Sequence, residues 1–476
     1  MLFSSTLFLF AFLPIALAAY FIAPGLRARN AVLLFFSLIF YAWGETAYVF
    51  LLAGSIGLNF ALGRLISQRR SGQNEKKFLI SAVALNLLLL GVFKYADFFV
   101  ANLNAVLSFF EISPIHLDPI HLPIGISFFT FQAITYIVDI HRGDAEAQTN
   151  PWRVGLYIAL FPQLIAGPIV RYQQIAQELN HRKSRLEDVA EGFRIFIIGL
   201  SKKVLIADTL AIAADAIFEI PIGELQTPVA WLGIIAFTFQ IYFDFSGYSD
   251  MAIGLGRSFG FHFPKNFNWP YTSESLREFW RRWHITLSSF FRDYLYIPMG
   301  GNRGQSTRTA FNLLTVFFLC GLWHGASWTF VLWGLLHGTF LALERTRFGH
   351  WLDAAPSIIR RAYVLAVVIL AWTFFRSPDI IHGWSYTVVL FGWTQPTGDA
   401  FPLALYVDRH FWTVLFIAAL STSHIPNQIW GHLRSKSGKL SLALEWTRSV
   451  ALLLALILCA LSMANGTHNP FIYFRF

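Results

Sequence analysis

The chain has few charged side chains. Asp, Glu, Lys and Arg make up 13 % of its 476 residues, about half the share of roughly 25 % found in soluble domains. The shortage is greatest between Ala310 and Leu343, where none of these four residue types occurs. Hydrophobic side chains reach 55 %, and apolar runs long enough to cross a bilayer recur from end to end. This composition excludes a soluble protein and predicts an all-α polytopic membrane protein.

Cysteine is equally scarce, and other hallmarks are missing. Only Cys320 and Cys459 occur, each inside an apolar run, which excludes a disulfide framework and a four-ligand zinc site. The Gly-x-x-x-x-Gly-Lys-Ser/Thr and His-Glu-x-x-His motifs are absent, so we expect no ATPase, serine esterase or zincin. His116 and His121 form only a weak pair of ligands, and no metal site is expected. With no long polar linker and no fixed repeat, residues 1–476 are read as one integral domain.

The net charge of +9 is spread along the chain. Basic residues separate the hydrophobic runs instead of forming one patch, which argues against nucleic-acid binding and for a role in topology. Residues 27–29, 64–77 and 265–308 are basic and predicted cytoplasmic, whereas the acidic stretch 97–121 is predicted outside. This alternation predicts about eleven spanning helices, with both termini outside the cytoplasm and 154–169 re-entrant or interfacial. The N-terminal apolar run lacks a signal-peptide pattern and is read as the first span.

One histidine lies at the centre of the uncharged run. His324 is flanked by Gly321 and Gly325, and the basic residues on both sides of 310–343 predict a hairpin of two helices with His324 deep in the membrane near its turn. Titratable groups at such depth usually line cavities, and a neutral imidazole is a good general base. The alternative is a packing residue bonded to a backbone carbonyl. His337, thirteen positions on, is read as packing.

A second candidate lies in residues 272–296, whose spacing predicts one amphipathic helix. Ser275 and Glu278 resemble a capping box at its start. His284 shares the apolar face and should point inward as a possible partner of His324, although a purely structural histidine fits as well. The polar face would lie on anionic lipid or receive a phosphorylated acyl donor. The apolar positions are Leu276, Phe279, Trp280, Trp283, Leu287, Phe291 and Tyr294, and the polar face holds Arg277, Arg281 and Arg292.

Two acids stand close together in residues 243–250. Asp244 and Asp250 fall near a predicted membrane boundary. Their default interpretation is helix capping, and substrate contact is the alternative.

Five segments together resemble the membrane-bound O-acyltransferases, in particular the bacterial branch that O-acetylates alginate. The similarity spans most of the chain, and the closing FIYFRF agrees with it. The segments are FFTFQAITYIVDIHRG from Phe128, FPQLIAGPIVRY from Phe161, YFDFSGYSDMAIGLGRSFGFHFPKNFNWPY from Tyr242, EFWRRWHITLSSFFRDYLYIPMGGNRG from Glu278 and GLWHGASWTFVLWGLLHG from Gly321.

The resemblance implies a ring of helices around a central funnel and tunnel in the bacterial inner membrane. It places the catalytic histidine at His324 and a second functional position at His284. We expect acetyl-CoA or another acyl thioester as donor substrate, with no tightly bound cofactor. Partners would be the lipid bilayer, an exported polysaccharide such as alginate and a periplasmic SGNH-type acetyltransferase. Residues expected to line the donor or substrate path are Trp323, Trp283, Trp280, Arg281, Arg282 and Asp244.

Other functions stay open at this point. Peptidoglycan or cellulose O-acetylation and D-alanyl transfer to teichoic acid are alternative acyl transfers, because the acceptor is expected to be chosen by the partner. A transporter or flippase with proton-relay histidines is the alternative outside enzymology. The lack of internal repeats argues against it.

Overall fold

The computed structural model describes the chain except residues 70–73, 395–399, 436–438, 466–470 and 473–476. The described residues form helices and no strand, so the all-α prediction is confirmed. The helices group into two compact units, residues 1–193 with 252–264 and residues 194–251 with 265–476. Two of the three boundaries fall inside helices α9 (Leu186–Ser201) and α11 (Thr227–Ser258), and the third falls after Pro264, outside any helix.

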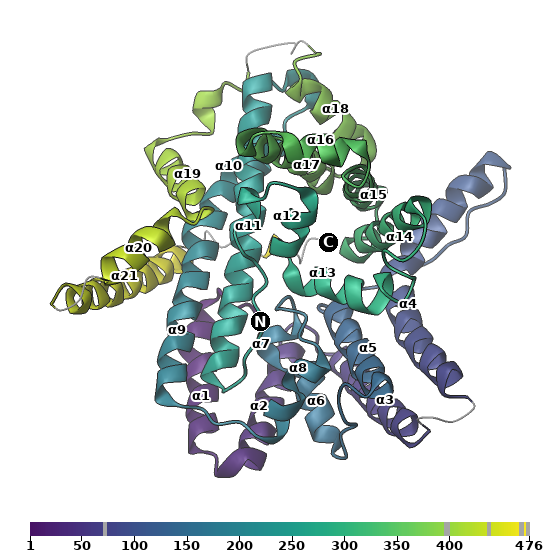
Figure 1. Cartoon of the computed structure of the whole chain (residues 1–476), viewed down its shortest axis with the longest axis vertical. Coiled ribbons are helices and arrows are strands. Elements are labelled where there is room, and N and C mark those ends of the chain that lie inside the picture. Colours follow the sequence, from purple (N-terminus) through teal and green to yellow (C-terminus); the bar gives the residue numbers. More distant parts are fainter. Residues whose placement is uncertain (70–73, 395–399, 436–438, 466–470, 473–476) are drawn as a thin grey trace. The chain divides into compact units, whose positions relative to one another are not determined.

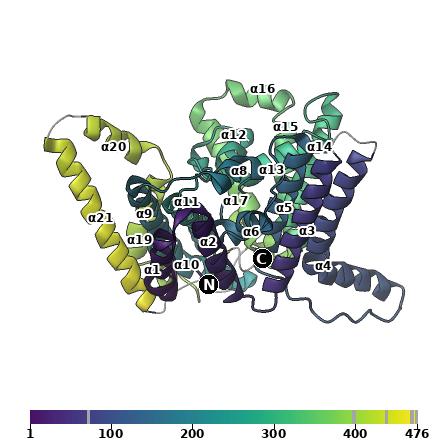
Figure 2. The ribbon, with the colours of Figure 1, turned by 90° about the horizontal axis from the view of Figure 1, so that it is seen from below.

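The first unit contains a layer of long helices, in which α3, α4 and α5 lie side by side (Figure 2). Two buried amides, Asn59 on α3 and Asn86 on α4, exchange hydrogen bonds of 2.9 and 3.0 Å, as polar groups between apolar helices must. The helices are α1 (Leu13–Ile22), α2 (Gly25–Ala42), α3 (Val49–Gln68), α4 (Glu75–Phe109), α5 (Ile126–Arg142), α6 (Pro151–Ala159), α7 (Phe161–Leu164) and α8 (Tyr172–Asn180).

Two segments of this unit test the predicted topology. Helix α4 continues through Asp97 to Phe109, so the expectation of an acidic loop beginning at Asp97 is wrong. A single carboxylate near the end of a long apolar run did not stop the helix. Residues 154–169 form no long helix, because α6 and α7 are separated at Leu160. Their re-entrant or interfacial position stays a prediction.

The second unit holds every candidate site residue named from the sequence (Figure 1). Its helices after α9 are α10 (Asp208–Phe218), α11, α12 (Leu276–Arg282), α13 (Ile285–Phe291), α14 (Ser306–His324), α15 (Trp328–Leu343), α16 (Arg347–Ala354), α17 (Ser357–Arg376), α18 (Ile380–Leu390), α19 (Arg409–Ser421), α20 (Ile425–Ser435) and α21 (Lys439–Ala464).

Helices α14 and α15 form the predicted hairpin. They approach so closely that a Cβ added at Gly321 would lie 2.3 Å from the Phe330 carbonyl oxygen, and one at Gly334 would lie 2.2 Å from that of Phe317. Only glycine permits backbones to meet at this distance. The Ser327 hydroxyl caps α15 by accepting the Thr329 N–H at 3.3 Å. The hairpin therefore places His324 at the last position of α14, beside the turn.

Several helices of the chain can cross a membrane. Among the described residues, six helices are long and apolar enough to cross a bilayer, and three shorter apolar helices accompany them. The chain is thus a multi-pass membrane protein. A total of eleven spans, the positions of the termini and the central funnel stay predictions.

Candidate active site

The segment 272–296 breaks at His284, so the prediction of one continuous helix is wrong. Helix α12 ends at Arg282 and α13 begins at Ile285, while His284 adopts left-handed backbone angles of φ 42° and ψ 54°. Backbone groups of the preceding segment form hydrogen bonds with the chain at the break. The Asn268 N–H donates to Arg282 O and the Ile285 N–H donates to Asn266 O, both at 2.9 Å. These bonds offset the cost of a left-handed non-glycine residue.

The predicted faces of this segment nevertheless hold. Arg277, Arg281 and Arg292 are exposed, and the apolar positions up to Phe291 are buried. The Ser275 hydroxyl accepts the Glu278 N–H at 3.1 Å as expected. The Glu278 carboxylate accepts the Glu274 N–H instead of closing the box on Ser275.

His284 is fully buried. Its Nδ1 lies 3.1 Å from Asn266 Oδ1, and its ring meets Phe245 edge-on at 4.6 Å and Trp323 at 6.0 Å between centroids. Burial holds the pKa of the imidazole well below its usual value of 6.5, because desolvation disfavours the cation. The ring is therefore neutral at physiological pH and can exchange a proton.

His324 is 5 % exposed and lies among aromatic rings. Trp323 and Trp333 each approach it at 4.9 Å, and Phe375 at 5.4 Å. The Trp323 ring thus contacts both histidines. The structure brings together the two residues that the sequence singled out forty positions apart, with one indole shared between them.

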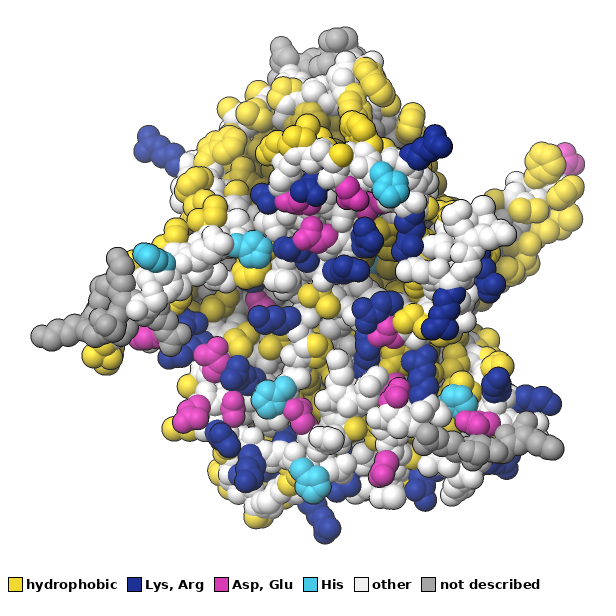
Figure 3. Space-filling model, in the orientation of Figure 1, with side chains coloured by type: hydrophobic (Ala, Val, Ile, Leu, Met, Phe, Trp, Pro, Cys, Tyr) yellow, Lys and Arg dark blue, Asp and Glu magenta, His cyan; other side chains and the backbone are white. Residues whose placement is uncertain are grey.

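A cavity of about 570 Å³ lies among α12, α13 and α14, and neither His284 nor His324 is among its lining residues. Its lining includes apolar Trp280, Val316, Phe317 and Cys320, the last one helical turn before His324. Charged lining residues are Arg277, Arg281, Arg292, Arg345, Glu344 and Asp353. Figure 3 shows Lys and Arg side chains gathered over the region of α12, α13 and α16. An apolar wall next to guanidinium groups suits a ligand with an anionic head and an uncharged arm.

One carboxylate of the cavity lining, that of Glu344, is already engaged. Glu344 accepts the backbone N–H groups of Leu276 at 2.6 Å and Arg277 at 3.2 Å. It therefore stabilises the N-terminus of α12. Arg292 is engaged as well, because Asp293 accepts hydrogen bonds from its guanidinium at 2.6 and 3.0 Å. Arg277, Arg281 and Arg345 are the lining arginines left for an anionic ligand.

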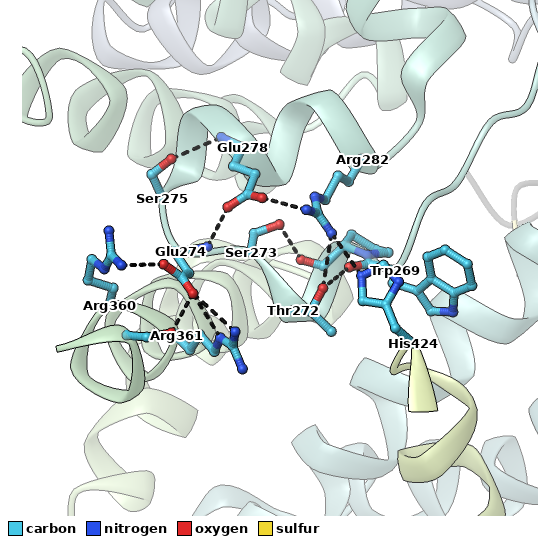
Figure 4. Close-up of polar contacts among 12 residues, drawn as sticks. Trp269, Thr272, Ser273, Glu274, Ser275, Glu278, Arg282, Arg360, Arg361 and His424 are labelled. Atoms are coloured by element: carbon cyan, nitrogen blue, oxygen red, sulfur yellow. Dashed lines mark hydrogen bonds and ion pairs between the residues drawn. The ribbon is translucent and has the colours of Figure 1, made fainter. Parts of the chain in front are cut away.

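Besides Trp323, three residues expected to line the donor or substrate path do not line this cavity. Trp283 is buried against Phe279 and Trp372, at 5.7 and 5.0 Å, and does not line the cavity. Arg282 does not line the cavity and lies in a polar cluster, where it pairs with Glu278 at 2.6 Å (Figure 4). Trp280 and Arg281 do line the cavity.

The third is Asp244, and its default interpretation as a cap is wrong. Asp244 and Asp250 both lie inside the 32-residue α11. Asp244 pairs with buried Lys203 at 2.7 Å and accepts the Ile472 N–H at 2.7 Å, while Asp250 pairs with Lys202 at 2.6 Å. The lysines of the neighbouring helix allow the acids to remain within a helix interior. Ile472 is the last residue that the structure describes, so the final four residues of the FIYFRF segment, 473–476, lie outside the described part of the chain.

One short sequence motif has to be weighed against the expectation that the chain is no serine esterase. Residues 256–260 read Gly-Arg-Ser-Phe-Gly and match the serine-esterase elbow. Ser258, however, ends α11, is buried, and donates its hydroxyl to Gly254 O at 3.0 Å. A nucleophile elbow requires an exposed serine on a sharp strand-to-helix turn. The match is therefore one of letters only.

Asn266, Trp333 and His337 are neighbours of the site that the sequence analysis did not assign to it. The Asn266 side chain bonds His284, and Trp333 contacts His324. Periodicity could not reveal Asn266, because it lies in the irregular segment before α12. The sequence feature that could have pointed to Asn266 is its position within one of the segments that resemble the membrane-bound O-acyltransferases.

Comparison with known proteins identifies the family of the chain. Residues 126–395 match the family model described as MBOAT, membrane-bound O-acyltransferase family. The chain is 40 % identical over its full length to the full length of the "Probable alginate O-acetylase AlgI" of Azotobacter vinelandii. It is 45 % identical over 82 % of its length to 75 % of the protein of the same name from Pseudomonas aeruginosa. It is 39 % identical over 80 % of its length to 78 % of the peptidoglycan O-acetyltransferase of Helicobacter pylori.

Proposed function

This chain belongs to the membrane-bound O-acyltransferase family and is an O-acyltransferase, and on that premise we propose that it moves an acetyl group from a cytoplasmic thioester across the inner membrane. The acetyl group would reach an exported polysaccharide, with alginate first among the candidates because of the relatives' names. The observation that carries the proposal is the pair of buried histidines that both contact Trp323, together with a cavity that is lined by arginines and reaches Cys320, one helical turn before His324.

The cavity supports acetyl-CoA as the donor. The phosphates of acetyl-CoA would bind Arg277, Arg281 and Arg345, since guanidinium groups make strong charge-assisted hydrogen bonds to phosphate. The uncharged pantetheine arm would lie along the apolar wall toward Cys320 and the end of α14. The thioester would then lie near His324.

The transfer itself needs a base and a path for one proton. His324 takes the proton from the acceptor hydroxyl while the oxygen attacks the thioester carbonyl. The C–O bond forms as the C–S bond breaks, and the proton passes to the departing thiolate. His284 shares this proton through its own neutral ring. No metal or bound cofactor enters these steps.

The acceptor has a second candidate. The Helicobacter pylori relative is named for peptidoglycan, which supports peptidoglycan O-acetylation as the alternative. A periplasmic SGNH-type partner would choose between the polymers, receiving the acetyl group on the outer side.

Proteoliposomes with labelled acetyl-CoA inside, and the partner with polysaccharide outside, test the proposal. We expect His324→Ala and His284→Ala to lower transfer by about a hundredfold or more, whereas the exposed His116→Ala should transfer normally. Full activity in His324→Ala would overturn the mechanism. Activity only with an acyl carrier protein would show that the donor is a carrier-bound thioester instead of acetyl-CoA. Transfer of D-alanine would show that the acyl group is not acetyl. Proton-coupled flux without acetyl consumption would indicate a transporter.

A further inference from the structure

Asn266 is the centre of a buried hydrogen-bond cluster next to His284. The asparagine is 1 % exposed and lies between α11 and α12. Its Oδ1 accepts the Thr286 backbone N–H at 3.2 Å and the Thr286 hydroxyl at 3.0 Å, and lies 3.1 Å from His284 Nδ1. Its Nδ2 donates to the Ser249 hydroxyl at 2.9 Å. The amide thus bonds three neighbours, Thr286, His284 and Ser249.

The orientation of this amide follows from chemistry. A backbone N–H can only donate, so the atom of Asn266 that faces Thr286 N must be the oxygen. Reversing the amide would set two N–H groups against that donor. The same oxygen faces His284 Nδ1, and a carbonyl oxygen can only accept. The hydrogen between them must therefore belong to the imidazole.

We propose that Asn266 is a positioning residue that holds His284 in the tautomer protonated at Nδ1 and leaves the lone pair on Nε2. The inference rests on the proposed role of His284 in proton exchange. Within the part of the chain that the structure describes, Nε2 is buried and makes no hydrogen bond. It is therefore the ring atom available to receive a proton from substrate or water.

The choice of an amide instead of a carboxylate has its own consequence. A carboxylate at this position would stabilise the imidazolium and raise the basicity of the ring, whereas a neutral amide fixes the tautomer without adding charge. Asn266 thus keeps His284 neutral and able to return a proton quickly. A carboxylate at the same position should shift the pH dependence as well as the rate.

Tautomers can be measured without any substrate. The test uses ¹⁵N-histidine-labelled full-length protein in nanodiscs, with the His284 signals assigned by their loss in His284→Gln. At pH 7 wild type should show protonated Nδ1 and unprotonated Nε2, and Asn266→Ala should show a mixture. Thr286→Val is the matched control, because it removes one hydroxyl contact but keeps the backbone donor. Protonated Nε2 in wild type, or an unchanged tautomer in folded Asn266→Ala, would overturn the inference.

Kinetics provide a second readout. Asn266→Asp should raise the pKa of the acidic limb of the pH–rate profile, and Asn266→Ala should lower the rate about tenfold or more without such a shift. An unshifted acidic limb in a folded Asn266→Asp protein would contradict the neutral-amide argument. If His284→Ala retains full transfer while the wild-type tautomer is as stated, the proposed role of His284 fails and the structural inference stands.

Discussion

The indole N–H of Trp280 donates a hydrogen bond to Nδ1 of His337 at 3.3 Å. This bond joins α12 to α15 and connects the cavity wall to the rings around His324, because Trp333 lies 5.1 Å from His337 and 4.9 Å from His324. His337 is therefore more than packing, since it fixes an indole that the donor would touch.

Replacing Trp280 by Phe should keep the ring contacts and remove this donor. A buried acceptor left without its partner costs about 1–3 kcal/mol, so we expect lower thermal stability together with a higher KM for acetyl-CoA. Melting curves and initial rates of the purified protein check both. Phe311→Leu, at an exposed position on α14, is the control. An unchanged KM would mean that Trp280 does not contact the donor.

Arg281 and Arg282 are adjacent in sequence but should differ in function. Arg281 lines the cavity, whereas Arg282 pairs with Glu278 outside it (Figure 4). Arg281→Gln should raise the KM for acetyl-CoA about tenfold, the loss of roughly 1.4 kcal/mol of phosphate binding, with a weaker dependence on salt. Arg282→Gln should leave that KM unchanged. Equal effects would argue against the cavity as the donor site.

Asp244 should matter for folding and not for substrate. Lys203 lies 2.7 Å from both Asp244 and Asp208, and all three are buried. Lys203→Met would remove the lysine counter-ion of two buried carboxylates, at a cost of about 3–5 kcal/mol. The double change Lys203→Met with Asp244→Asn should recover part of that loss. Expression and thermal stability in detergent measure it, and a substrate role for Asp244 would instead appear as a KM change in stable protein.

The contact between α14 and α15 predicts a steric effect. Gly334→Ala would bring a methyl group to 2.2 Å from the Phe317 carbonyl oxygen, which forces the hairpin apart at a cost of about 1–3 kcal/mol or more. Gly54→Ala, where nothing lies within 4 Å, should be neutral or stabilising. Tryptophan fluorescence during thermal unfolding compares them. Equal melting temperatures would show that the hairpin is looser than described.

Acid should weaken the polar cluster around Glu274 (Figure 4). The Ser357 hydroxyl, then Arg361 and Arg360, hold the pKa of this carboxyl below its usual value of 4.5. A lowered pKa gives stability that is present above 4.5 and lost as pH falls through the folded value. The difference in melting temperature between wild type and Glu274→Gln should therefore be constant from pH 8 to 5 and shrink below. A difference that widens in acid would reverse the assigned sign.

Patterns of hydrophobicity predicted the elements that depend on local burial. The hairpin at 310–343, the inward face around His284 and the exposure of Arg277, Arg281 and Arg292 all follow from spacing and charge. The break at His284 could not be predicted, because it depends on backbone groups of Asn266 and Asn268 that approach only after folding. Asp244 was misread for the same reason, since its partner Lys203 is on another helix.

The two walls of the cavity should differ in how well they tolerate substitutions that change the choice of donor. The α14–α15 wall is held by glycines in backbone contact, so enlarging residues along its seam would damage the scaffold itself. The opposing wall offers Ser288 and Ser289, two small side chains of α13 that line the same space. Libraries that search for longer or bulkier acyl groups should therefore vary α13 and leave the glycine seam intact.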